Sequence, residues 1–410
     1  MCEGVALEAI AREVGTPCYV YSTAGIREQY ARLRDALGKL DARLHYSVKA
    51  NSSIAILSLL RGLGAGLDIV SGGELFRALK AGYKGKDVVF SGVGKTEREM
   101  EEALRAEVLL FNIESEQELH VLDRVARRLG VTAPVALRVN PEVLVDTPHP
   151  YTRTGEKGMK FGIPFDEALS VAKIAVTLRN IRLMGLDMHV GSQISQFAPY
   201  EVGLQRLLHL RREIERDAKV KLEYLDIGGG LAVTYDAERT VDVGQFGKVI
   251  NALVGGAGLK IILEPGRFLV GNAGVLLTRV LYRKRSGGKE FIIADAGMTD
   301  LLRPSHYNAF HRIEAVKPRG RDTVADVVGP ICESGDFLAL DRQIDDAAPG
   351  DLLAVQSTGA YGFVMSSNYN SRPRSAEVLV DGDRFAVITR RESYDDLVRN
   401  EEAHPDWRSA

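Results

Sequence analysis

The sequence predicts an α/β protein, namely a (β/α)8 TIM-like barrel plus a mostly antiparallel C-terminal β domain joined by the N-terminal strand. Two observations predict this fold. Short apolar runs alternate with longer amphipathic stretches over the first two thirds of the chain, which is typical of a parallel sheet covered by helices. After about residue 270, strand-like runs follow one another through short turns, which favours antiparallel pairing.

The predicted barrel strands are residues 44–48, 67–71, 88–91, 108–113, 135–140, 183–190, 224–227 and 261–264. Between most of them lie stretches with a helical period, of which the clearest are Glu97–Ala106, Glu116–Leu129 and Glu201–Asp217. Eight strand–helix units in roughly 240 residues fit a (β/α)8 barrel. We therefore expect a barrel domain over residues 25–270.

The C-terminal strands are expected at Val275–Arg283, Glu290–Ala294, Thr323–Val328, Asp351–Gln356, Ala376–Val380 and Arg384–Thr389. Asp381-Gly382-Asp383 separates the last two runs and has the composition of a hairpin turn. Residues 16–21 also resemble a strand, although they precede the barrel. We expect residues 1–24 and 271–410 to form one β-sandwich or β-barrel-like domain.

Composition narrows the class of protein. The chain has 410 residues, a net charge of −2 and 26% charged residues, with no block of like charge suited to nucleic acid or an anionic membrane. The three cysteines, Cys2, Cys18 and Cys332, have no CxxC spacing, which argues against a disulfide framework and a zinc site. The N-terminus lacks the pattern of a secretory signal, so we expect a reduced, cytoplasmic protein without a metal.

Lys49 follows the first barrel strand and precedes a helical pattern. Active sites of such barrels lie at the C-terminal ends of the strands, and lysine is the side chain that forms imines with carbonyl compounds. This position points to pyridoxal phosphate (PLP) or other Schiff-base chemistry. A surface lysine after a strand is the simpler alternative, and the neighbouring strand ends decide between the two.

Polar residues and glycines recur where the other predicted strands end. They are Asp68, Arg138, Asn140, His189, Gly191, Ser192, Gly228, Gly229, Gly230, Glu264, Gly266 and Arg267. Packing alone does not explain so many polar residues on one face. We therefore expect them to surround a ligand.

Each of these positions also has a structural interpretation. Three consecutive glycines form either a phosphate-binding nest or a tight turn. Glu264 can pair with a protonated pyridine nitrogen, or with Arg267 as a local ion pair. His189 can lie flat on a cofactor ring or serve as an ordinary core histidine. The residues around Asp146–Gly158 form either a lid over the site or a surface insertion.

The β domain adds a second group of reactive side chains. Cys332 can donate a proton or simply fill apolar space, and Glu333 can bind an ammonium group. Tyr361 presents a phenol between small residues, and Arg303, near Tyr307, can bind a carboxylate.

Taken together, these segments resemble the motif set of PLP-dependent decarboxylases with the alanine-racemase fold. The matching segments are Tyr46–Asn51, Val70–Glu74, His189–Gln193, Asp226–Gly230, Glu264–Arg267, Cys332–Ser334, Ala360–Gly362 and Asn370–Arg374. They cover nearly the whole chain in the expected order. Glu333 after the cysteine, and Arg303 with Tyr307, resemble the branch of the family that acts on diaminopimelate.

The resemblance implies specific roles. Lys49 holds PLP covalently, Glu264 pairs with the pyridine nitrogen and His189 stacks on the ring, with Asp68 nearby. The cofactor phosphate is expected to lie among Ser192, Gly229, Gly230 and Arg267, with Tyr361 near it, and Gly266 is also expected to contact the cofactor. The substrate is expected to contact Arg267, Arg303, Tyr307, Glu333 and Tyr361.

The implied reaction is decarboxylation of meso-2,6-diaminopimelate at its D-centre to L-lysine and CO2, the last step of lysine biosynthesis. Protonation by Cys332 or Lys49 completes it, with Cys332 and Glu333 supplied by the second subunit of a homodimer. The alternatives within enzymes are decarboxylases of D-lysine or D-ornithine, L-ornithine, or carboxynorspermidine. The alternative outside enzymes is a non-catalytic PLP-binding regulator, which is expected to lack some of the motif residues that this chain retains.

Overall fold

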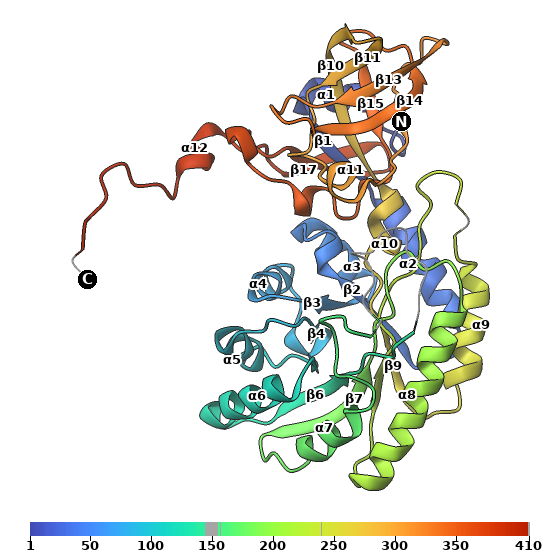
Figure 1. The fold of residues 1–410 in the computed structure, drawn as a ribbon, viewed down its shortest axis with the longest axis vertical. Helices are drawn as coiled ribbons and strands as arrows, with labels where there is room; N and C mark the ends of the chain where they lie inside the picture. The colour runs from blue at the N-terminus through green and yellow to red at the C-terminus, as the bar shows by residue number, and fades with distance from the viewer. Residues whose placement is uncertain (144–154, 156, 239, 409–410) are drawn as a thin grey trace. The chain divides into compact units, whose positions relative to one another are not determined.

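The computed structural model describes residues 1–143, 155, 157–238 and 240–408. The chain divides into two compact units (Figure 1), one of residues Gly25–Asn272 and the other of Met1–Ala24 with Ala273–Ala410. Each unit is built around its own sheet.

The first unit is a closed parallel barrel in the order β2-β3-β4-β5-β6-β7-β8-β9. Its strands are β2 (Ala42–Ser47), β3 (Gly66–Ile69), β4 (Val88–Phe90), β5 (Leu110–Ile113), β6 (Ala133–Arg138), β7 (Ile181–Asp187), β8 (Tyr224–Asp226) and β9 (Lys260–Leu263). Parallel pairing of β2 with β9 closes the ring. Every strand predicted for the barrel is present, so the predicted fold is confirmed for this unit.

Helices of this unit surround the strands. They are α2 (Thr23–Leu37), α3 (Ile54–Gly62), α4 (Gly72–Lys80), α5 (Glu97–Arg105), α6 (Glu116–Leu129), α7 (Ala168–Ala175), α8 (Ala198–Asp217), α9 (Val243–Val254) and α10 (Arg267–Val270). Several begin at an N-cap that satisfies backbone donors. Ser71, Thr96 and Ser115 accept hydrogen bonds from the backbone N–H groups of Glu74, Glu99 and Glu118, which fixes where these helices start.

The second unit contains a mixed, mostly antiparallel sheet in the order β14-β13-β11-β10-β1-β16-β17, with β15 pairing with β10 and β12. The strands are β1 (Cys18–Ser22), β10 (Gly274–Ser286), β11 (Lys289–Ala294), β12 (Ile313–Ala315), β13 (Asp322–Val328), β14 (Phe337–Asp345), β15 (Leu352–Val355), β16 (Ala376–Asp381) and β17 (Arg384–Thr389). Its helices are α1 (Leu7–Val14), α11 (Arg303–Tyr307) and α12 (Tyr394–Val398).

The N-terminal strand joins this second sheet, as predicted. β1 lies between β10 and β16 and pairs parallel with β16 and antiparallel with β10. β16 and β17 form the predicted hairpin around Gly382. β12 and β14 were not predicted.

Apolar residues fill the interior of both units. In the barrel, Val89, Leu110, Ala136, Met184 and Ile262 form one buried cluster. In the β unit, a cluster of buried residues that includes Ile10, Cys18, Val20, Leu277 and Val378 packs α1 onto the sheet. Among the described residues, no helix combines the length and apolar character needed to cross a membrane.

Candidate active site

A ring of buried polar side chains lies at the C-terminal ends of the barrel strands. Each strand from β2 to β9 contributes one residue, which is one of its last two residues or directly follows it. In order, they are Ser47, Asp68, Ser91, Asn112, Arg138, Asp187, Asp226 and Glu264. Each is less than a tenth exposed. Burying polar groups is unfavourable unless they are paired, so this ring is a costly arrangement that packing alone does not require.

Lys49 lies at the edge of this ring, on a short 3-10 turn that follows β2. The hydroxyl of Tyr46 donates to the carbonyl of Asn51 (2.9 Å) and closes the turn. The Lys49 Nζ donates to Asp68 Oδ2 (2.7 Å), which also accepts from Ser47 Oγ (2.8 Å). The side chain of Lys49 is 37% exposed, so its amine is both fixed in place and accessible to a carbonyl compound.

The pKa of the Asp68 carboxyl is lowered. Burial raises the pKa of this carboxyl, but the Lys49 ammonium and the hydrogen bonds from Lys49 and Ser47 lower it by more, so the net shift is downward. Asp68 is therefore ionised and holds the lysine amine electrostatically.

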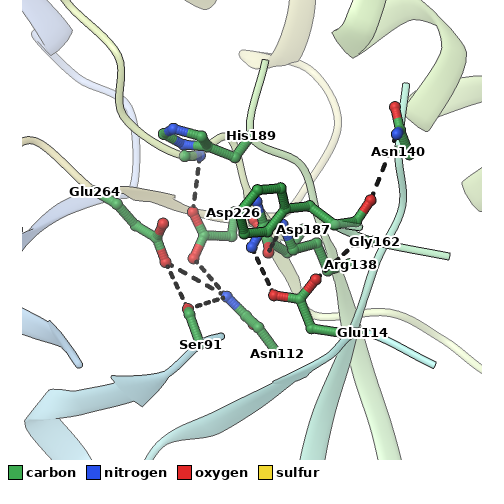
Figure 2. A network of polar contacts seen from close by, with 12 residues as sticks. Ser91, Asn112, Glu114, Arg138, Asn140, Gly162, Asp187, His189, Asp226 and Glu264 are labelled. Carbon is green, nitrogen blue, oxygen red and sulfur yellow. Dashed lines mark hydrogen bonds and ion pairs between the residues drawn. The ribbon is translucent and has the colours of Figure 1, made fainter. Parts of the chain in front are cut away.

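Glu264 is hydrogen-bonded to two other members of the ring (Figure 2). Its Oε1 accepts from Ser91 Oγ (3.2 Å) and lies 3.4 Å from Asn112 Nδ2. Burial and the nearby charge of Asp68 raise the pKa of Glu264 to about 7. A carboxyl poised in this way accepts or shares a proton near neutral pH, as a partner for a pyridine nitrogen must.

Two further acids lie against Glu264. Asp187, Asp226 and Glu264 each place one carboxyl oxygen within 4.8 Å of the other two. Burial and the charge of Glu264 raise the pKa of both aspartates well above the usual value. Asp226 accepts from the N–H of Gly228 (3.0 Å) and lies within hydrogen-bonding reach of Glu264, so a protonated Asp226 can donate to Glu264.

Arg138 belongs to the same ring but pairs with Glu114, an acid outside the ring. Its Nη1 contacts Glu114 Oε1 (2.6 Å), and Glu114 Oε2 accepts from the N–H of Gly162 (2.7 Å). Asn140 contacts the carbonyl of Phe161 (3.4 Å). Both residues were singled out from the sequence as strand-end polar groups, and here they tie the chain at Phe161–Gly162 to the barrel (Figure 2).

His189 follows β7 and is partly buried. Its Nδ1 accepts a hydrogen bond from the N–H of Gly229 (3.2 Å). Burial and the charges of Arg138 and Lys49 lower the pKa of the imidazole to about 3. The ring is therefore neutral, with its proton on Nε2, and a neutral imidazole stacks on an aromatic ring without carrying charge into the site.

The three glycines after β8 act mainly through close packing. The N–H groups of Gly228 and Gly229 already donate to Asp226 and His189, so the run is not the open nest considered from the sequence. A side chain at Gly229 would overlap the carbonyl oxygen of Glu264, and one at Gly230, which has φ +103°, would overlap that of Gly191. Only glycine lets these strand ends approach.

A cationic group suited to phosphate lies beside them. Arg267 begins α10 and is 8% exposed, and its guanidinium donates to Ser192 Oγ (3.2 Å) and to the hydroxyl of Tyr235 (2.6 Å). Gly266 packs so closely that a Cβ would lie 3.0 Å from the Cβ of Ser47. Tyr235 was not predicted, because no strand or motif marks it in the sequence.

The residues of the barrel unit fit PLP. One face of the barrel holds the groups that this cofactor needs. They are a lysine amine that can form an imine (Lys49), a buried acid with a pKa near 7 (Glu264), a neutral histidine (His189), and an arginine–serine pair that can bind a phosphate (Arg267 and Ser192). Asp68 Oδ1 is buried without a hydrogen-bond partner among the described residues, so the ring still has acceptor capacity for a further donor.

In the β unit, Arg303 is buried on the one-turn helix α11. Its Nε donates to His311 Nε2 (3.2 Å), and its guanidinium carbon lies 5.9 Å from the centroid of the Tyr307 ring. The predicted pair Arg303 and Tyr307 is therefore brought together, and His311, which was not predicted, joins it.

Three other predicted residues lie elsewhere in the β unit. Cys332 and Glu333 are exposed, with Cys332 Sγ 3.4 Å from Asn370 Oδ1. Tyr361 has a left-handed backbone conformation (φ +56°), which costs energy in a residue other than glycine and is common at functional sites. The predicted lid at Asp146–Gly158 lies for the most part outside the described residues.

Comparison with known proteins gives a consistent result. The model of a family described as "Pyridoxal-dependent decarboxylase, pyridoxal binding domain" matches residues 23–271. The chain is 50% identical over 404 residues to the diaminopimelate decarboxylase of Pseudomonas aeruginosa, covering 98% of this chain and 97% of that one. The chain is also 48% identical over 398 residues to the diaminopimelate decarboxylase of Aquifex aeolicus, covering 97% of this chain and 94% of that one.

A solved structure is similar over the same extent. Diaminopimelate decarboxylase from Helicobacter pylori, complexed with L-lysine, has a TM-score of 0.92 and 39% sequence identity, covering 96% of this chain and 98% of that chain.

Proposed function

Because the chain belongs to the pyridoxal-dependent decarboxylases, and within them to the diaminopimelate decarboxylase family, we propose that it decarboxylates meso-2,6-diaminopimelate at the D-centre to give L-lysine and CO2. The observation that carries the proposal is the barrel ring. It holds the amine of Lys49 2.7 Å from Asp68 and places Glu264, with a pKa of about 7, in the same layer.

When bound, PLP supplies a pyridinium ring that accepts the electron pair left behind as CO2 departs. Lys49 would hold the cofactor through its amine. Glu264 would pair with the pyridine nitrogen, and the neutral His189 would contact the ring. Arg267, Ser192, Gly229 and Gly230 would hold the phosphate, with Tyr361 near it and Gly266 also at the cofactor.

Recognition of the far end of the substrate by the protein selects diaminopimelate over other amino acids. We assign its distal carboxylate to Arg303, with Tyr307 and Tyr361 beside it, and its distal ammonium to Glu333; Arg267 also contacts the substrate. A buried arginine left without its carboxylate is unfavourable. Substrates that lack this group are therefore rejected, by factors that reach ~10⁴ in sites of this kind.

Proton return completes the reaction, and Cys332 and Lys49 are the two candidate donors. Cys332 and Glu333 are exposed in the single chain, where a second copy can reach them. We propose a homodimer in which these two residues serve the site of the partner subunit. We further propose that the enzyme acts in the cytoplasm, where free thiols such as its three cysteines persist.

The first test is an absorption spectrum of the purified protein during addition of meso-diaminopimelate, with CO2 and lysine assayed in the same sample. We expect a visible PLP band that changes on addition, together with formation of lysine. A PLP band without turnover would redirect the assignment to D-lysine, D-ornithine or carboxynorspermidine. Absence of a PLP band after reconstitution would refute the role of Lys49.

The assignment of Arg303 predicts that Arg303→Ala loses most turnover of diaminopimelate while it retains bound PLP. The reason is that Arg303 belongs to the substrate end of the site rather than to the cofactor ring. Steady-state kinetics and the PLP-to-protein ratio measure the two properties separately. Loss of PLP together with activity would make Arg303 a structural residue instead.

A further inference from the structure

Arg303 is hydrogen-bonded to His311, a residue with no role in the proposed reaction. The arginine lies on α11, a helix of only five residues, and is 7% exposed. So short a helix cannot by itself fix the end of a long side chain, because ordering the rotamers of an arginine costs conformational entropy. A contact that provides the missing support is the hydrogen bond from Arg303 Nε to His311 Nε2, at 3.2 Å.

His311 is itself anchored to the sheet. Its side chain is fully buried, and its Nδ1 lies 2.9 Å from the carbonyl oxygen of Gln356. Gln356 directly follows β15, and its N–H bonds the carbonyl of Arg312 (2.8 Å), which extends the ladder between β12 and β15. The carbonyl of His311 accepts from Arg342 Nη1 (2.8 Å). Both the backbone and the ring of His311 are thus fixed.

These contacts determine the form of the imidazole. A guanidinium only donates hydrogen bonds, so Nε2 of His311 accepts and carries no proton. The proton of the neutral ring therefore lies on Nδ1, where it donates to the Gln356 carbonyl. The chain from the sheet carbonyl through the imidazole to Arg303 is complete in this tautomer alone.

We propose that His311 is a positioning residue that sets the orientation of Arg303 and thereby selects substrates with a distal carboxylate over amino acids that lack one, such as D-lysine. The proposal rests on the proposed function, in which Arg303 receives that carboxylate. With Nε engaged by His311, the carboxylate is received by the terminal Nη1 and Nη2 groups, a bidentate geometry that depends on the plane of the guanidinium.

L-lysine and cadaverine isolate this effect. Both are five-carbon chains with two amines, and they differ by one carboxylate. In the proposed reaction, the carboxylate that lysine retains is the distal carboxylate of diaminopimelate. The ratio of the two dissociation constants, measured by calorimetry on the holoenzyme, therefore reports how well Arg303 is oriented, independently of turnover.

Two replacements of His311 separate its two hydrogen bonds. His311→Asn keeps a donor near the position of Nδ1 and removes the acceptor for Arg303. His311→Gln keeps an acceptor that reaches Arg303. We expect His311→Asn to weaken L-lysine binding by about tenfold, which corresponds to the loss of one charge-assisted hydrogen bond, with cadaverine binding unchanged. His311→Gln is expected to recover most of the lysine affinity.

Arg303→Ala serves as the reference, and thermal unfolding of each variant reports on folding. If Arg303→Ala leaves the lysine-to-cadaverine ratio unchanged, the role of Arg303 in the proposed function fails. If Arg303→Ala shifts the ratio and His311→Asn does not, the proposal for His311 alone is overturned. Equal loss of lysine affinity in both His311 variants, or equal weakening of both ligands with a lowered melting temperature, would also overturn it by giving His311 a structural role.

Discussion

At the scale of single residues, the central property of the site is the protonation of Glu264. Its pKa is raised to about 7, first by burial and then by the charge of Asp68. Between the usual glutamate pKa and this value, folded apoprotein binds a proton that the unfolded chain has released. The free energy of unfolding therefore falls as pH rises through this range.

We predict that Glu264→Gln abolishes this pH dependence in the apoprotein. Relative to the variant, the wild-type protein should lose on the order of 3 kcal/mol of stability between about pH 4.5 and pH 7. Urea unfolding of both apoproteins at several pH values measures the difference. A difference that stays flat across the range would mean that the pKa of Glu264 is not raised by folding.

Asp226 illustrates a second consequence of crowding acids in one ring. Its pKa is raised well above the ordinary value by burial, Glu264 and Asp187, so its carboxyl is protonated at neutral pH. An asparagine has nearly the same shape and offers a carbonyl oxygen as acceptor and an amide group as donor. We predict that Asp226→Asn stays within about 1 kcal/mol of wild-type stability at pH 7, whereas Asp226→Ala leaves buried groups unpaired and costs about 2–3 kcal/mol.

Urea unfolding and metal analysis of the purified protein test this prediction together. The three carboxyls Asp187, Asp226 and Glu264 lie close enough to bind a cation. A stoichiometric metal ion that is lost in Asp226→Asn would show that the acids are ionised, and would contradict the assignment of a proton to Asp226.

At the scale of elements, the turn after β8 depends on glycine for space. A Cβ at Gly229 would overlap the backbone carbonyl of Glu264, which cannot move without displacing the end of β9. A Cβ at Gly94, by contrast, would have no heavy atom within 4 Å, and the φ angle of Gly94 is not left-handed. The two positions therefore differ mainly in the room around them.

We predict that Gly229→Ala destabilises the protein by about 1–3 kcal/mol, the usual cost of overpacking, and weakens PLP binding because Glu264 is displaced. Gly94→Ala, as the matched control, should change neither property appreciably. Urea unfolding and titration with PLP measure the two effects. Equal behaviour of the two variants would show that the turn relaxes freely and does not position Glu264.

The elements also show which parts of the fold were predictable. Barrel strands such as β3 and β5 are entirely buried, so each appears in the sequence as a short apolar run interrupted only by the one polar residue that it contributes to the ring. β14 was missed because the exposed polar residues Asp341 and Gln343 interrupt its apolar pattern, and β12 has only three residues. Strands that face water on one side carry a weaker signal than fully buried ones.

At the scale of the whole molecule, the site was predictable only where a residue carries a local pattern. Lys49 and Glu264 lie in short motifs at strand ends. Ser91 and Asn112, by contrast, are ordinary residues at the ends of apolar runs, and Ser91 meets Glu264 across 173 positions of sequence. Closure of the barrel creates that contact. An acid recurs near the ends of the apolar strands, at Asp68, Asp187 and Asp226. This recurrence is the sequence pattern from which the polar ring could have been predicted.

The proposed sharing of Cys332 between subunits leads to a quantitative prediction for the assembly. Lys49→Ala removes the amine proposed to hold the cofactor, and Cys332→Ala removes the thiol proposed to act in the partner's site, so each homodimer should form little lysine. In a mixed dimer, one site combines both defects and the other contains neither. Random mixing of equal amounts makes half of all dimers mixed, each with one of two sites intact.

Mixing the two inactive variants under conditions that allow subunit exchange should therefore restore about one quarter of wild-type lysine formation, as follows from closed twofold symmetry. Mixing each variant with buffer alone, and mixing without exchange, are the controls. If Cys332 instead acted in the site of its own chain, each mixed dimer would contain two defective sites. No activity would then return, although sedimentation would still show a dimer.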